Sequence, residues 1–176
     1  MKEVLKIGFV GTAISPYYAE EQKVRKNSEV HLKKILENFD VELISFHKTI
    51  FSKDDSVEAE NLLKNKVDFL LIQTSSCSSG EQLYPLCNIS SKIGVWAVPD
   101  IEKEGGVKLH SLVSTSHYLG IIKKTLSKRK IKTKWFYNYA DTDEFKNKFL
   151  ITVKSLIAQK KPKQIKKGLK GGTGRA

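Results

Sequence analysis

The sequence predicts an α/β fold in which a five-stranded parallel sheet is doubly wound into three layers, with helices on both faces. Two observations support this prediction. Short apolar segments alternate five times with segments of helical periodicity, a pattern typical of parallel strands joined by right-handed crossovers. In addition, residues 67–74 are apolar on both faces of a strand, as expected in the middle of a parallel sheet.

The expected strands are short apolar segments, and two of them end at a residue that breaks strands. Gly11 ends the first and Pro99 stops the fourth. Alternation of such strands with helices is typical of a flavodoxin/Rossmann-like arrangement. The expected strands cover residues 6–11, 41–46, 67–74, 93–98 and 132–139.

Helices are expected after each of these strands. The first helix has an apolar face in its second half, with Leu32, Leu36 and Phe39, whereas its first half is almost entirely polar and should meet water or a partner. Ser52 or Asp54 should cap the second helix, because their side-chain oxygens accept hydrogen bonds from free N–H groups of the first turn. The expected helices cover residues 17–39, 54–65, 81–89, 109–126 and 141–158.

Length and composition favour one soluble globular domain. The chain has 176 residues, 40% hydrophobic and 28% charged, and its apolar runs are shorter than the roughly 20 residues that cross a bilayer. We expect a domain over residues 1–158 and a basic, Gly/Lys-rich disordered tail over 159–176. The start lacks a cleavable signal pattern and two cysteines are too few for a disulfide framework, so we expect a cytoplasmic protein with reduced thiols and no membrane partner.

The net charge of +12 is concentrated in two places. Residues 159–176 contain six Lys, one Arg and no acidic residue, and residues 123–134 form a second Lys- and Arg-dense segment. Clustered cations release counterions from nucleic acid, so a phosphate-binding surface is one interpretation, and a solvated face beside a disordered tail is the other. The tail has no aromatic residue on which the bases of a single strand could stack.

Ligands of doubly wound sheets bind outside the carboxyl ends of the strands, here at the loops after the first, third and fourth strands. The first loop has neither the Gly-x-Gly-x-x-Gly of dinucleotide sites nor the Gly-Lys-Ser/Thr of a P-loop. The third loop is the most ligand-like, because small hydroxyl residues precede a helix whose free N–H groups could hold an anion, although a capping loop would look the same. The candidate anion-binding residues are Ser75, Ser76, Ser78, Ser79 and Gly80.

The same loop contains Cys77, a candidate nucleophile. A thiol near a helix N-terminus can have a lowered pKa. A small enzyme based on Cys77 would also need a base close by, such as His110 or His117. The alternative is a small, semi-buried thiol, and Cys87 in the following helix is expected to be a packing residue.

Residues near the fourth strand suggest a ligand site without suggesting a metal. His110 and His117 are seven residues apart, so within one helix they would lie about 10 Å apart, too far to share an ion. No residue stands out as a positioned general acid or base. Trp96 is either a core aromatic or a face on which a sugar could stack. The hydroxyl-rich helix start around Ser111 could bind a sugar or a phosphate, or could be a capped helix.

As a set, several segments resemble the N-terminal domain of the L-fucose/L-arabinose isomerase-like family. The resemblance covers about residues 6–158 and is one of pattern. It includes the opening strand and the strand at 68–72 with its Ser/Gly loop. It also includes Ile-Gly-Val-Trp-Ala-Val-Pro at 93–99 and Leu-His-Ser-Leu-Val at 109–113, followed by a helix.

This resemblance implies an aldose–ketose isomerase that moves a proton between C1 and C2 with a divalent metal, usually manganese. In that family the metal ligands come from later domains, so the chain resembles a truncated or isolated N-terminal domain without catalysis of its own. The resemblance implies that such a domain is a scaffold, which helps to build an oligomer and forms one wall of a sugar pocket. The residues that the resemblance places at the pocket edge are Trp96, Ser111 and His117.

Two other functions stay open on the sequence. One is a basic nucleic-acid-binding or regulatory α/β module that uses residues 123–134 and the tail. The other is the small enzyme that uses Cys77 with a histidine. Salt dependence of binding would distinguish the first from the isomerase domain, and reactivity of the thiol would distinguish the second.

Overall fold

The computed structural model describes residues 4–14, 18–100 and 108–160, and in this part of the chain the predicted fold class is confirmed. Five strands form one sheet in the order β2-β1-β3-β4-β5, and all neighbouring pairs are parallel. This order is the flavodoxin-like one among doubly wound sheets. The strands are β1 Leu5–Thr12, β2 Val41–Ser45, β3 Phe69–Thr74, β4 Lys92–Ala97 and β5 Lys132–Tyr137.

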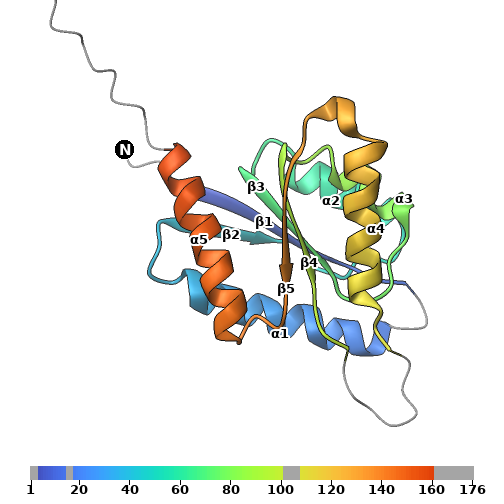
Figure 1. Ribbon diagram of the computed structural model, residues 1–176, viewed down its shortest axis with the longest axis horizontal. Coiled ribbons are helices and arrows are strands. Elements are labelled where there is room, and N and C mark those ends of the chain that lie inside the picture. The colour runs from blue at the N-terminus through green and yellow to red at the C-terminus, as the bar shows by residue number, and fades with distance from the viewer. Residues whose placement is uncertain (1–3, 15–17, 101–107, 161–176) are drawn as a thin grey trace, which may run out of the picture.

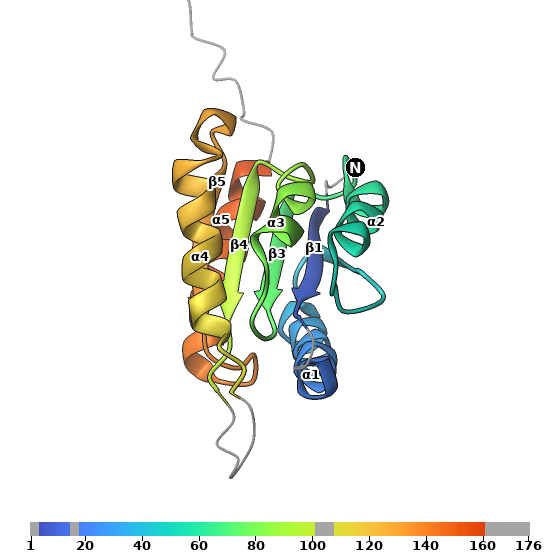
Figure 2. The same cartoon turned by 90° about the vertical axis from the view of Figure 1, so that its right-hand side faces the viewer.

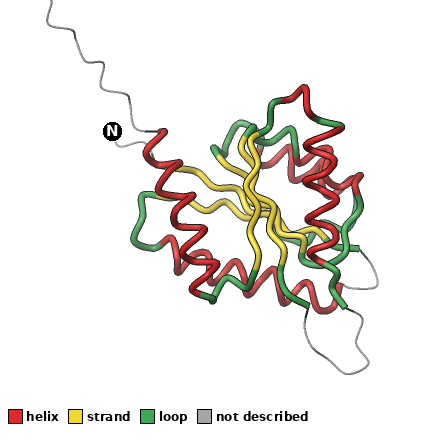
Figure 3. The backbone as a smooth tube through the Cα atoms, in the orientation of Figure 1, coloured by secondary structure: helices red, strands yellow, loops and turns green. Residues whose placement is uncertain are grey.

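Helices cover both faces of the sheet, which gives the three layers seen in Figures 1 and 2. One hydrophobic cluster lies under α1 and α5, and a second lies under α2, α3 and α4 on the other face. The tube in Figure 3 shows the strands enclosed between these helices. None of the described helices is long and apolar enough to cross a membrane. The helices are α1 Tyr18–Leu36, α2 Lys53–Leu63, α3 Gly80–Leu86, α4 Ser111–Lys124 and α5 Asp143–Lys160, with a 3-10 turn, η1, at Ser127–Arg129.

The central and edge strands differ in burial as their positions require. Every residue of β3 is buried, because this strand has neighbours on both sides and helices on both faces. β5 is an edge strand, and its residues 132–135 are exposed. Lys132 and Lys134 lie on this edge, where charged side chains discourage pairing with another chain.

The ends of several elements differ from the sequence-based expectation. α1 stops at Leu36, earlier than predicted, because the backbone then turns and Phe39 N–H donates to the Leu36 carbonyl at 2.9 Å. α5 continues through Lys160, whose ammonium lies 2.6 Å from the Asp68 carboxylate. The predicted tail at 159–176 therefore starts inside a helix, and the rest of it lies outside the described residues.

The predicted cap of α2 is present, and Ser52 rather than Asp54 forms it. Ser52 Oγ accepts the backbone N–H of Asp55 at 3.1 Å, and the Asp55 carboxylate accepts the Ser52 N–H at 3.1 Å. These reciprocal bonds satisfy two of the N–H groups that a helix start leaves free.

Candidate functional site

The carboxyl ends of the strands lie at one edge of the sheet, and the predicted site residues lie on the connections that leave it. After β1 the chain passes to α1 on one face, whereas after β3 it passes to α3 on the other face. Since β1 and β3 are neighbours, the connections diverge between them. Such a switch point is where doubly wound folds bind ligands.

The hydroxyl groups of the loop after β3 are used inside the protein. Ser75 Oγ donates to Gln73 Oε1 at 3.0 Å, and Ser78 Oγ donates to the Ser76 carbonyl at 3.0 Å. Ser78 Oγ also lies 2.9 Å from Thr12 Oγ1. Ser75, Ser76 and Ser78 are all buried. These side chains of the predicted anion-binding loop therefore have internal partners.

The remaining two loop residues begin α3. The backbone N–H of Ser79 donates to Gln82 Oε1 at 3.0 Å. A Cβ built on Gly80 would lie 2.9 Å from Ile121 Cδ1 and 3.4 Å from His117 Cε1, so glycine allows α3 and α4 to approach each other here. Capping and packing account for these contacts, and anion binding by the loop stays a prediction.

A second set of buried hydroxyls joins the end of β3 to the start of α4. Thr74 Oγ1 lies 2.7 Å from Thr115 Oγ1 and 2.9 Å from the Ser111 carbonyl. Ser111 Oγ accepts the Val98 N–H at 2.9 Å and donates to the Thr74 carbonyl. Ser111 is 1% exposed, and its hydroxyl is already bonded to Thr74 and Val98. This side chain therefore joins α4 to the ends of two strands and does not make the expected sugar contact.

Trp96 is a core residue. Its side chain is 0% exposed, and its ring centroid lies 4.3 Å from that of Phe145. The indole N–H donates to the Asn138 carbonyl at 2.8 Å. Of the two interpretations of Trp96, the core aromatic describes the structure, and its ring offers no exposed face to a sugar.

The histidines and cysteines near this edge have different environments. His117 is exposed on α4, and His110 precedes the helix in the left-handed conformation with φ of 55°. Cys77 is partly buried, and its use as a nucleophile with a histidine base stays a prediction. Burial raises the pKa of the Cys87 thiol to about 12, so this residue is the packing thiol that was expected.

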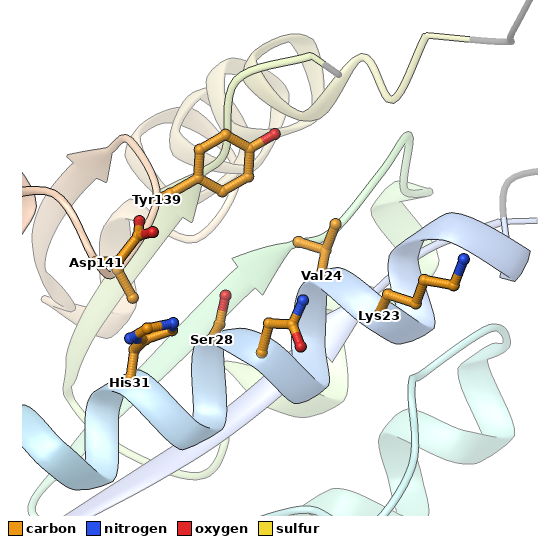
Figure 4. A pocket seen from close by; sticks show the side chains of 8 residues that line it. Lys23, Val24, Ser28, His31, Tyr139 and Asp141 are labelled. Carbon is orange, nitrogen blue, oxygen red and sulfur yellow. The ribbon is translucent and has the colours of Figure 1, made fainter. Parts of the chain in front are cut away.

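A cavity of about 290 Å³ lies between α1 and the connection from β5 to α5, as Figure 4 shows from close by. Lys23, Asn27 and His31 are spaced by four residues and so share one face of α1. Tyr139 and Asp141 approach from the opposite side. The lining residues are Lys23, Val24, Asn27, Ser28, His31, Tyr139, Ala140 and Asp141.

Two hydroxyls of this cavity keep hydrogen-bonding capacity for a ligand. Ser28 Oγ accepts from Gln73 Nε2 at 2.8 Å, which leaves its own hydrogen for another acceptor. The Tyr139 hydroxyl donates to the Pro99 carbonyl at 2.9 Å, which leaves its oxygen as an acceptor. Burial raises the pKa of Tyr139, so this hydroxyl is protonated at neutral pH. With the ammonium of Lys23, the cavity can both donate to and accept from one small ligand.

The sequence analysis did not single out these cavity residues. It followed the rule of strand-end loops to the first, third and fourth strands, whereas the cavity is formed by a helix and by the loop after β5. The available signal is the polar first half of α1, in which Lys23, Asn27 and His31 recur at the spacing of one helix face. Their proximity to Asp141 depends on the tertiary fold.

The family resemblance implies a manganese ion whose ligands come from later domains, so it assigns no metal ligand to the described residues. Among them, no group of three or more His, Cys, Asp and Glu side chains is arranged to hold a metal ion. Protein sites for such cations need several oxygen or nitrogen ligands around one point. We therefore assign no metal-dependent step to the described residues.

No family model matches the chain, and no curated protein sequence matches it. The function proposed below is therefore supported by the geometry of the site and by the pattern of the sequence.

Proposed function

We propose that this chain is a sugar-binding domain that forms the scaffold and one wall of the pocket in an L-fucose/L-arabinose-type aldose–ketose isomerase. The main support is the polar cavity between α1 and the β5–α5 connection, at the edge of the sheet where doubly wound folds bind ligands. The sequence resemblance to that isomerase family supplies the class of sugar and of reaction.

The lining of the cavity favours a neutral ligand with many hydroxyl groups over a simple anion. A sugar hydroxyl both donates and accepts, and the cavity offers an acceptor on Asp141, both functions on Asn27 and a cationic donor on Lys23. The Asp141 carboxylate would repel an anionic ligand. Val24 and Ala140 add apolar surface for the C–H groups of a ring. A volume of about 290 Å³ suits a monosaccharide.

In this proposal the chain binds and orients the sugar, and other parts of an intact isomerase move the proton. Asp141 accepts hydrogen bonds from ring hydroxyls, while Asn27 and Ser28 on α1 fix the opposite side of the ring. Binding from two sides sets the orientation of the sugar, which is the contribution of a pocket wall to catalysis.

Isothermal titration calorimetry with L-fucose and L-arabinose tests the binding. We expect saturable binding of at least one sugar, and Asp141→Asn should weaken it at least tenfold because a charge-assisted acceptor is lost. Lys154→Gln, a change on the exposed side of α5, is the control and should bind as the unchanged chain does. Absence of binding by both sugars, or equal affinity of the Asp141 variant, would contradict the proposal.

A separate experiment tests whether this chain lacks isomerase activity of its own. Purified chain with added manganese should not interconvert L-fucose or L-arabinose with the corresponding ketose, because the family resemblance places the metal ligands in later domains and the described residues hold no group of three or more metal-ligating side chains. A chromatographic assay of the sugars measures this directly. Conversion by the chain alone would contradict the proposed non-catalytic role while leaving the binding result intact.

Binding of single-stranded nucleic acid is a second candidate function, favoured by the exposure of Trp135. Residues 119–139 contain seven Lys or Arg and no acidic residue. Within this segment Trp135 is 48% exposed on the edge strand β5, and Lys148 Nζ lies 4.0 Å from its ring centroid. Cations beside an exposed aromatic ring suit phosphates and stacked bases. Lys132 and Lys134 lie on the same strand.

Fluorescence anisotropy with a labelled oligonucleotide tests this candidate. The logarithm of the affinity should fall linearly with the logarithm of the salt concentration. Trp135→Ala should weaken single-strand binding about tenfold, because stacking on one aromatic side chain contributes about 1–3 kcal/mol, and should change duplex binding little. The double variant Lys53→Gln/Lys66→Gln removes two exposed positive charges elsewhere on the surface. It should weaken single-strand binding and duplex binding modestly and to the same extent. No binding at low salt would exclude this function.

A further inference from the structure

A second cavity, of about 420 Å³, lies at the carboxyl end of β2, between α1 and the β2–α2 connection. Figure 2 shows this connection curving outward beside β1. The second cavity shares no lining residue with the one between α1 and the β5–α5 connection. The lining residues are Arg25, Lys26, His47, Lys48, Thr49, Phe51 and Asp55.

Arg25 is a buried cation held in one position. Its Nη1 donates to Glu29 Oε2 at 3.2 Å and to the Phe46 carbonyl at 3.3 Å, and its Nη2 donates to the His47 carbonyl at 3.4 Å. Its aliphatic chain passes close to Gly11, where an added Cβ would lie 2.7 Å from Arg25 Cγ. The guanidinium is therefore fixed by Glu29 on α1 and by two carbonyls that follow β2, while the aliphatic part of Arg25 packs against Gly11 of β1.

Two buried polar atoms on residues that line this cavity have no hydrogen-bond partner in the described part of the chain. They are Arg25 Nε and Thr49 Oγ1. Thr49 is 4% exposed, and the side chain of Arg25 is 5% exposed. Buried polar groups in native proteins are nearly always paired, so two unpaired donors at one cavity indicate a partner rich in acceptors.

The permanent charges on the lining residues are mostly positive. Arg25, Lys26 and Lys48 are cations, and Asp55 is the carboxylate among the lining residues. Its carboxylate lies 2.7 Å from Lys48 Nζ and accepts the backbone N–H of Phe51 at 3.0 Å. Partial burial opposes the charge of Asp55, but these hydrogen bonds outweigh it and lower its pKa. Asp55 is thus ionised and already paired at neutral pH.

The carboxylates outside the lining are paired as well. Glu58 lies 2.9 Å from Lys48 Nζ and 3.7 Å from His47 Nε2. Glu29 lies 2.8 Å from Lys33 Nζ in addition to its bond with Arg25. Lys26 adds an exposed ammonium at the rim. The cavity therefore combines two unpaired buried donors with an added cation.

From these observations we propose that the second cavity binds a small oxyanion of the phosphate class. One oxygen of the anion accepts the Arg25 Nε–H, another accepts the Thr49 hydroxyl, and Lys26 neutralises the remaining charge. The volume of about 420 Å³ admits inorganic phosphate and also the phosphoryl end of a small ester. This site does not depend on the proposed sugar site, since the two share no lining residue.

Amide chemical shifts of the full chain, followed by NMR at constant ionic strength, test the proposal with inorganic phosphate, sulfate and a pentose phosphate as probes. We expect saturable shifts at residues 25–26 and 47–49. Thr49→Val should weaken phosphate binding at least fivefold, and Thr49→Ser, which keeps the hydroxyl, should retain it. Thr152→Val makes the same chemical change on α5 and is the matched control.

The outcomes separate the alternatives. Equal affinity for inorganic phosphate and for the pentose phosphate would indicate a site that recognises the phosphoryl group alone. Tighter binding of the pentose phosphate would indicate a site for a larger phosphorylated molecule. Both results support the proposal. Shifts that do not saturate and that spread over the lysine-rich surface indicate screening of charge and would overturn it. Equal phosphate affinity of the Thr49→Val variant and the unchanged chain would overturn it as well.

Discussion

Two polar regions at the carboxyl edge of this sheet differ in how their polar groups are bonded. In the loop at 75–80 the buried serine hydroxyls are bonded to neighbouring protein groups. In the cavity beside α1, Asn27 and Asp141 are exposed, and the hydroxyls of Ser28 and Tyr139 keep capacity for a ligand. A hydroxyl-rich sequence at the end of a strand is therefore a weaker indication of a ligand site than polar side chains that still lack partners.

Thr74→Val should produce the largest change in stability. Thr74 Oγ1 is the centre of the buried network that includes Thr115 and Ser111, and the change leaves these groups incompletely bonded. Buried polar groups without partners cost about 1–3 kcal/mol each, so we expect a loss of about 3 kcal/mol in urea unfolding. The same substitution at Thr152 on α5 is the control. A loss below about 0.5 kcal/mol at Thr74 would show that the network is not structural.

Gly11→Ala should cause the second-largest loss of stability. This variant tests how closely α1 approaches β1. The added Cβ would lie 2.7 Å from Arg25 Cγ and 2.8 Å from Ser75 Oγ. Overpacking of this kind costs about 1–3 kcal/mol. Gly120→Ala is the matched comparison: it adds the same methyl group within α4, with no atom inside 4 Å, and should stabilise the protein by up to about 1 kcal/mol. Thermal unfolding of both variants measures the contrast.

Asp68→Asn should have a smaller effect that depends on pH. Partial burial opposes the charge of Asp68, but hydrogen bonds from Lys160 and from the Lys6 N–H outweigh it and lower the pKa of Asp68. The stability from this depressed pKa is present above the unfolded-state value of about 4 and is lost as pH falls through the folded-state value. We expect a loss of about 1 kcal/mol or less at pH 7 that disappears near pH 2. A loss that is equal at both pH values would contradict the ion pair.

Asn27→Ala should have the smallest effect on stability and a large one on binding. Asn27 is exposed, so its removal should change the free energy of unfolding by no more than about 0.5 kcal/mol. Its loss should weaken sugar binding several-fold, since it removes one donor and one acceptor from the lining. Calorimetric titration of this variant beside Thr74→Val separates binding residues from structural ones. Equal sugar affinity of Asn27→Ala and the unchanged chain would remove Asn27 from the site.

The fold was predictable because it depends on patterns within single segments. The apolar run that forms β3 and the alternation of strands and helices required no knowledge of distant contacts. Ser52, which caps α2, was one of the two cap candidates because of its own side chain. The end of α1 was missed because the turn after Leu36 is a local hydrogen bond that periodicity does not encode.

The candidate site was predictable only in part, because its residues meet through the tertiary fold. Trp96 and Ser111 have residue types that suit a sugar pocket, but burial and internal hydrogen bonds engage both. The cavity instead depends on α1 lying opposite a loop more than 100 residues later in the chain, around Asp141. Arg25 is similar, since two of its partners, the carbonyls of Phe46 and His47, lie just after β2, about 20 residues later in the chain.

Amide chemical shifts of the full chain during titration with L-fucose or L-arabinose test the central claim most directly, because they locate the bound sugar. The account predicts saturable shifts confined to residues 23–31 and 139–141, with the loop at 75–80 unchanged. Shifts centred on that loop, or no saturable shift with either sugar, would contradict it.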